Sequence, residues 1–192
     1  YHLESRELDV YRARLAGDGS GIVYNAASVS GDPSADSEIV KVSWDGSVVE
    51  ALSVPLLAHD FVELPDGSYA AIVVEYRDFE GSPLRGERIV EIAKDGGTTV
   101  VWRSWDCFDP SIHMGDDAAN GWTLANALDY DAKEDVYYLG MRNFSSIVRI
   151  DRRTGACDWV LGLAASSFTF APGSARFLHQ HQFQVSGNHI LL

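Results

Sequence analysis

The chain has 192 residues, of which 15 are Lys or Arg and 28 are Asp or Glu, giving a net charge of −13. This acidic surplus disfavours binding to nucleic-acid phosphates and anionic lipid headgroups, so we expect no nucleic-acid partner. With 46% hydrophobic and 22% charged residues the chain can bury a core, which excludes a disordered protein. No run approaches the roughly 18 consecutive apolar residues of a membrane-spanning helix, so we also expect no membrane span in this chain.

Three segments of the chain read almost alike: each alternates apolar and polar residues and ends at a glycine. They are residues 39–46, 89–96 and 147–155, so they begin about 50 and then 58 residues apart. A second β-rich run follows each one. This pattern predicts a hairpin with turn residues at its tip.

Further strand pairs lie upstream of the second and third hairpins, at residues 60–76 and 126–140. Four strands recurring at such intervals, with almost nothing helical between them, indicate a β-propeller built of four-stranded blades. A β-sandwich is the main alternative. We expect blades at about 7–54, 58–105 and 121–161, and the opening strand of the next at 179–192, all in one propeller domain spanning 1–192.

This blade count predicts an incomplete ring. Propellers close with about four to eight blades, whereas this chain covers about three blades plus one strand. The chain also starts at Tyr1 and stops inside an apolar run. We therefore expect a fragment of a longer protein, cut at both ends.

The first strands of propeller blades line the central channel, so residues at the start of those strands converge. At these positions stand His59, Asn126 and His181. The hairpin that follows Asn126 places Arg142 opposite Leu124, and so in the same ring of residues. These side chains offer several hydrogen-bond donors and no carboxylate, which predicts a site for an anionic group.

The same region carries a family resemblance. Residues 121–131 read GWTLANALDYD, residues 141–151 read MRNFSSIVRID, and residues 180–183 read QHQF. Together these motifs resemble the arylsulfotransferase family, whose pattern is W-T-H-A-N, an Arg on the next strand, and then Q-H. The resemblance runs from about His59 to the end of the chain.

The resemblance implies a six-bladed propeller that moves a sulfuryl group from an aryl sulfate to a phenol through a sulfohistidine. Its partners would be these two small molecules, with no metal and no organic cofactor. It also implies a periplasmic or extracellular protein. By position, Asn126 and Arg142 would bind the sulfate oxygens, His59 would assist, and His181 would be the nucleophile. His179 is the alternative nucleophile if the strand register differs by two residues.

One position departs from the family pattern, because Leu124 stands where the family has a histidine. Leucine can neither donate a hydrogen bond nor exchange a proton. The alternative function is therefore a catalytically impaired propeller that serves as a binding or assembly module.

The two cysteines, Cys107 and Cys157, allow at most one internal disulfide and exclude a four-cysteine zinc site. Both fall after or within the fourth strands of neighbouring blades. We expect free buried thiols, with a disulfide as the alternative.

Overall fold

A computed structural model describes residues 9–27, 37–112, 121–187 and 189–192. Parts of the expected first blade (7–8 and 28–36), of the segment between the second and third blades (113–120) and of the last expected strand (188) lie outside these residues. Within them the fold is all-β, as predicted, with one short helix, α1 (Ser104–Cys107).

The strands form three four-stranded antiparallel sheets, each made of consecutive strands in chain order, and a final hairpin. The first sheet holds β1 (Asp9–Leu15), β2 (Gly21–Ala27), β3 (Glu38–Ser43) and β4 (Val49–Ser53). The second holds β5 (Leu57–Glu63), β6 (Tyr69–Phe79), β7 (Ser82–Ile92) and β8 (Thr98–Arg103). The third holds β9 (Ala125–Asp131), β10 (Val136–Met141), β11 (Ser146–Asp151) and β12 (Cys157–Gly162). The hairpin is β13 (Gln184–Ser186) and β14 (His189–Leu191).

The three similar segments of the sequence fall on the third strand of each sheet, at β3, the end of β7, and β11. Each pairs with the fourth strand that follows it, so the predicted hairpins are confirmed. The glycines at their ends have positive φ angles of 71°, 85° and 69° (Gly46, Gly96 and Gly155). Glycine adopts this conformation at no steric cost, which explains why it ends each segment.

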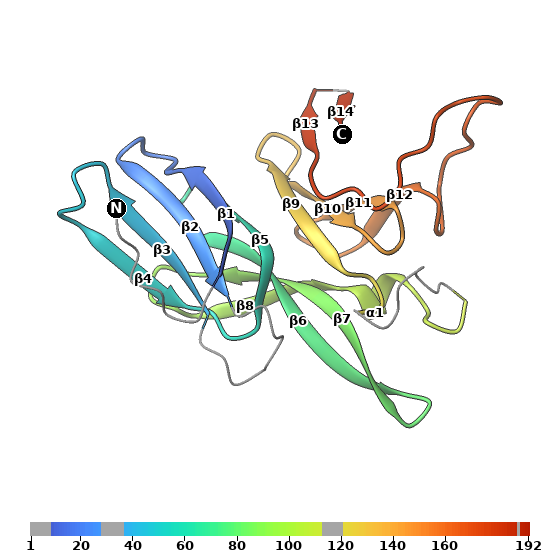
Figure 1. The fold of residues 1–192 in the computed structure, drawn as a ribbon, viewed down its shortest axis with the longest axis horizontal. Helices are drawn as coiled ribbons and strands as arrows, with labels where there is room; N and C mark the ends of the chain where they lie inside the picture. The colour runs from blue at the N-terminus through green and yellow to red at the C-terminus, as the bar shows by residue number, and fades with distance from the viewer. Residues whose placement is uncertain (1–8, 28–36, 113–120, 188) are drawn as a thin grey trace.

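The sheets are arranged so that their first strands are neighbours, with β5 between β1 and β9 (Figure 1). Apolar side chains fill the seams between neighbouring sheets. The seam between the first and second sheets includes Ile39 and Phe61, and that between the second and third includes Ile89, Trp102 and Tyr137. Each sheet thus buries its faces against a neighbour, as stacked four-stranded units do.

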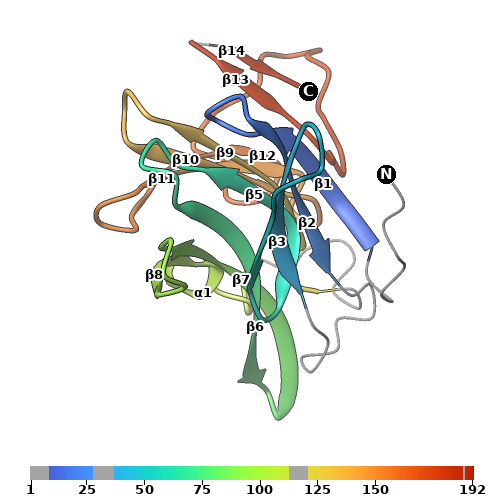
Figure 2. The same cartoon turned by 90° about the vertical axis from the view of Figure 1, so that its left-hand side faces the viewer.

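Strands β6 and β7 are 11 residues long, compared with five to seven in the other strands of the three sheets. The far half of this hairpin extends beyond its sheet in both views (Figures 1 and 2). There the backbone oxygen of Arg85 accepts a hydrogen bond from the N–H of Trp122, at 2.7 Å. The long hairpin therefore holds the residues that lead into β9.

The prediction of free thiols is wrong, because Cys107 and Cys157 form a disulfide. The end of α1 and the start of β12 lie together at the seam between the second and third sheets. Their Cα atoms are 6.1 Å apart, within the usual range for a disulfide. The sequence shows two distant cysteines, and only the packing of the sheets brings them together.

The single opening strand expected over 179–192 is also corrected. Residues 179–183 have no regular structure, and the strands β13 and β14 follow them. The side chains of Gln180 and Phe183 instead anchor this segment on the third sheet, where Gln180 bonds to backbone oxygens and Phe183 joins a core cluster. No helix in the described ranges is long and apolar enough to cross a bilayer.

Candidate functional site

His59 lies near the start of β5, and its ring meets the edge of the Tyr11 ring at a centroid distance of 5.2 Å. Its Nδ1 atom is buried without a hydrogen-bond partner among the described residues. Burial first, and then the positive charges of Arg85 and His181, together lower the pKa of His59 to about 4. The imidazole is therefore neutral at pH 7.

This shift predicts a pH-dependent stability. The folded pKa of His59 is about 4 and its ordinary value is 6.5, so the unfolded chain binds the extra proton between these values. The His59 contribution to stability is present above pH 6.5 and is lost as the pH falls toward 4. Following the imidazole signals of His59 by NMR titration checks this directly. We expect a midpoint well below 6, and a midpoint near 6.5 would contradict the described burial.

Asn126 lies on β9 and connects this strand to the segment that carries His181. Its side-chain Nδ2 donates to the backbone oxygen of Gln180 at 2.7 Å. The Gln180 side chain in turn donates to the backbone oxygens of Met141 and Ser146 at 3.3 and 2.8 Å. His181, which follows at once, is exposed, and its charge acts on His59. The structure thus brings His59, Asn126 and His181 to one end of β5 and β9.

Arg142 begins the turn between β10 and β11. Its backbone N–H donates to the oxygen of Leu124 at 3.0 Å, so the predicted opposition of these two residues is confirmed. One guanidinium nitrogen donates to Asn143 Oδ1 at 2.9 Å, and Asn143 Nδ2 donates to the oxygen of Gly121 at 2.7 Å. These bonds hold the Arg142 side chain on Asn143, whose amide contacts the backbone of Gly121, shortly before β9.

Three residues other than glycine have left-handed backbone conformations at this end of the sheets. Leu124, Ser145 and His179 have φ angles of 45°, 46° and 49°. The His179 N–H donates to Ser145 Oγ at 3.1 Å, so two of these residues are in contact. Such conformations cost non-glycine residues roughly 1–3 kcal/mol each and persist where surrounding contacts enforce them, which is typical of functional sites.

A buried carboxylate that the sequence did not point to lies on the long hairpin, next to the residues that lead into β9. Glu87, on β7, is fully buried and accepts hydrogen bonds from the Thr123 hydroxyl and the Ala125 N–H. Arg85 Nε lies 3.7 Å from Glu87 Oε1. Burial raises the pKa of Glu87. The only signal in the sequence is that Arg85 and Glu87 are two residues apart on a strand, and so share one face.

Unpartnered polar atoms accumulate around these residues. Among the described residues, His59 Nδ1, Arg85 Nε, Glu87 Oε1 and Asn126 Oδ1 are buried and have no hydrogen-bond partner. Buried polar atoms are nearly always hydrogen-bonded to protein or water. Their concentration here therefore indicates a place for a polar ligand or for ordered water.

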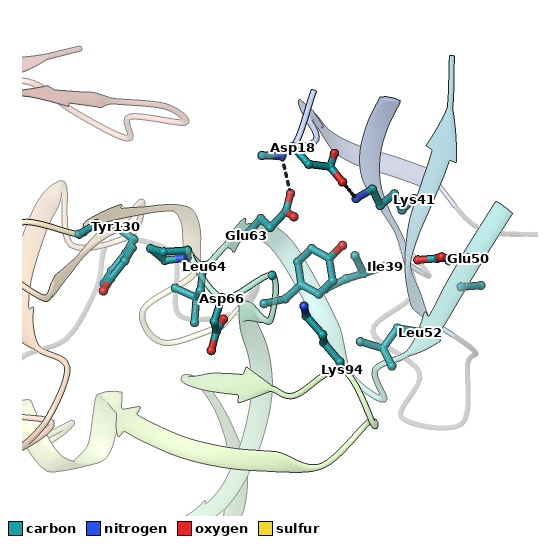
Figure 3. Close-up of a pocket in the computed structure, with 16 residues that line it drawn as sticks. Asp18, Ile39, Lys41, Glu50, Leu52, Glu63, Leu64, Asp66, Lys94 and Tyr130 are labelled. Carbon is teal, nitrogen blue, oxygen red and sulfur yellow. Dashed lines mark hydrogen bonds and ion pairs between the residues drawn. The ribbon is translucent and has the colours of Figure 1, made fainter. Parts of the chain in front are cut away.

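A cavity of about 870 Å³ lies at the opposite end of β5, where that strand turns into β6 (Figure 3). Carboxylates of Asp18, Glu50, Glu63 and Asp66 line it, and Lys41 is paired with Asp18 at 2.8 Å. This negative lining disfavours an anion. The cavity and the predicted anion site are therefore different places.

The predicted histidine, asparagine and arginine residues thus lie on or next to the strands of the second and third sheets and on the segment that follows them. The family model of Arylsulfotransferase (ASST) matches residues 15–185, and the chain belongs to this family. No curated protein matches the chain.

Two solved structures match part of this chain. Hydrazine synthase of Kuenenia stuttgartiensis is 17% identical, with a TM-score of 0.47 over 73% of this chain and 39% of its own. A candidate 6-phosphogluconolactonase of Bacteroides fragilis is 10% identical, with a TM-score of 0.41 over 94% of this chain and 59% of its own. The chain thus spans less than two thirds of the length of either.

Proposed function

We propose that the protein transfers a sulfuryl group from an aryl sulfate to a phenol through a sulfohistidine on His181. Membership of the arylsulfotransferase family supports a sulfotransferase-like function in general. The observation that carries the finer proposal is the hydrogen bond from Asn126 to the oxygen of Gln180. This bond ties the segment that carries His181 to the start of β9, the strand that also carries Asn126.

In the first step a neutral nitrogen of His181 attacks sulfur, the N–S bond forms, the aryl O–S bond breaks, and the phenolate leaves. In the second step a phenol oxygen attacks the same sulfur, the N–S bond breaks, and the phenolic proton is lost. Negative charge develops on the sulfuryl oxygens, where Arg142 and Asn126 donate hydrogen bonds. In the second step the phenolic proton passes to the neutral imidazole of His59.

We further propose that the sheets are blades of one six-bladed propeller spanning 1–192 and continuing beyond it, with the site at the channel. The packing of β5 between β1 and β9 supports this arrangement. An exported location is supported by the Cys107–Cys157 disulfide, because disulfides persist in oxidising compartments such as the periplasm and the cell exterior.

Transfer is tested with the full-length protein, nitrophenyl sulfate as donor and a phenol as acceptor. We expect acceptor-dependent release of nitrophenol, lowered at least about 10³-fold by His181→Asn, because loss of a nucleophile removes the covalent route. His189→Asn is a matched control, since His189 is an exposed histidine of β14. Equal rates for wild type and His181→Asn would sink the proposal.

A second candidate is a binding module without turnover. Leu124 favours it, because one donor of the family pattern is missing while Asn126 and Arg142 remain. Such a protein would bind nitrophenyl sulfate in calorimetry and release no nitrophenol.

A further inference from the structure

We propose that Arg85, carried by the extended β6–β7 hairpin, is a further anion-binding residue of this site, additional to the residues of the family motifs. The inference rests on the proposed function. It assigns to the long hairpin the role of delivering a second guanidinium beside Arg142. Neither the family motifs nor the repeats of the sequence point to this residue.

The pairing register of the hairpin decides which side chains face the site. Arg85 pairs with Tyr76, and Glu87 lies two residues further along the same face. Glu87 bonds to Thr123 and Ala125, the two neighbours of Leu124. The face that carries Arg85 is therefore the one turned toward position 124.

The opposite face of the hairpin is already occupied. Arg77 pairs with Leu84, and its guanidinium lies over the Trp105 ring at 5.3 Å. A Cβ placed on Gly86 would come within 3.2 Å of the same Trp105 ring. Arg77 and Arg85 thus lie on opposite faces of the hairpin, and Arg77 is turned away from position 124.

The local packing leaves room for the Arg85 side chain. A Cβ placed on Gly121 would lie 3.2 Å from Arg85 Cδ and 3.6 Å from Nε, and Gly121 has a φ of +124°. Position 121 therefore favours glycine for two reasons: the positive φ angle, and the close approach of the Arg85 side chain. Gly121 directly precedes the W-T-L-A-N motif, and its missing side chain leaves the space that the Arg85 side chain occupies.

The Nε donor of Arg85 is not used by a hydrogen bond among the described residues. This atom is buried, and its distance of 3.7 Å to Glu87 exceeds a hydrogen bond. Glu87 is itself held by Thr123 and Ala125, and burial favours its neutral form. An anion beside His59 would satisfy the free donor. The charge of Arg85 lowers the pKa of His59, which agrees with Arg85 lying near His59.

The test compares the full-length wild type with Arg85→Met, Arg85→Lys and Arg77→Met by calorimetry with inorganic sulfate and with nitrophenyl sulfate. A charge-assisted hydrogen bond is worth about 1.5–3 kcal/mol, so Arg85→Met should weaken binding about 10-fold to 100-fold. Arg85→Lys, which keeps the charge and loses the planar fork, should fall between wild type and Arg85→Met. Arg77→Met should bind as the wild type does.

Thermal unfolding separates a folding defect from a binding defect. If Arg85→Met does not fold, Arg85→Lys provides the comparison, with weaker binding and unchanged unfolding as the expected result. Unchanged affinity in a folded Arg85 variant, or absence of sulfate binding by the wild type, overturns the inference. If the wild type binds sulfate but releases no nitrophenol, the proposed enzymatic function is wrong. A weaker binding by the Arg85 variants would still support the inference about Arg85.

Discussion

Replacing Leu124 by histidine is expected to accelerate sulfuryl transfer by about 10²–10³-fold, because one donor in an oxyanion-type site contributes about 3 to 4 kcal/mol to the barrier. The family pattern has histidine here, between Thr123 and Ala125. The backbone at 124 is left-handed, with a φ of 45°, and histidine tolerates this conformation better than leucine does. The measurement is the initial rate of nitrophenol release at saturating phenol.

The control is Leu124→Asn, which also suits the left-handed backbone and donates a hydrogen bond but exchanges no proton. We expect a smaller gain for it, and the difference between the two variants measures the proton-transfer contribution. A rate for Leu124→His equal to that of the wild type would show that position 124 takes no part in the reaction.

Asp60→Ala is expected to lower the free energy of unfolding by about 3–5 kcal/mol, the usual cost of removing one partner of a buried ion pair. Asp60 lies on β5, and both its oxygens accept from Arg14 of β1 at 3.1 Å. Its Oδ2 also accepts from the Leu128 N–H of β9 at 2.9 Å. This carboxylate thereby links the first strands of all three sheets, and denaturant unfolding measures its contribution.

Two controls qualify this result. Asp60→Asn keeps the acceptor oxygen and should lose less stability than Asp60→Ala. Glu50→Ala removes an exposed carboxylate from β4 and should change stability by at most about 0.5 kcal/mol. Equal losses for Asp60→Ala and Glu50→Ala would contradict the role of Asp60 as a link between sheets.

The parts of the fold that were predictable are those that depend on local pairing. The alternation and terminal glycines at 39–46, 89–96 and 147–155 identified the third strands, because both features act within a few residues. The contact of Arg142 with Leu124 followed from a single hairpin, whose turn fixes the register.

The features that could not be predicted depend on packing between sheets. Glu87 resembles a surface residue in the sequence, yet the long hairpin buries it against Thr123 and brings Arg85 with it. The Cys107–Cys157 disulfide joins two sheets whose angle no local pattern determines. Residues 179–183 lack a strand because Gln180 bonds to the third sheet instead of to a partner strand.

The central claim is that His181 carries the sulfuryl group. It is tested most directly by incubating the full-length protein with nitrophenyl sulfate without acceptor and mapping modified peptides by mass spectrometry under non-acidic conditions. We predict one added sulfuryl group on the peptide containing His181, lost when phenol is added and absent in His181→Asn. A sulfuryl group on His179 or His59 instead, or no adduct in a protein that releases nitrophenol, would contradict the account.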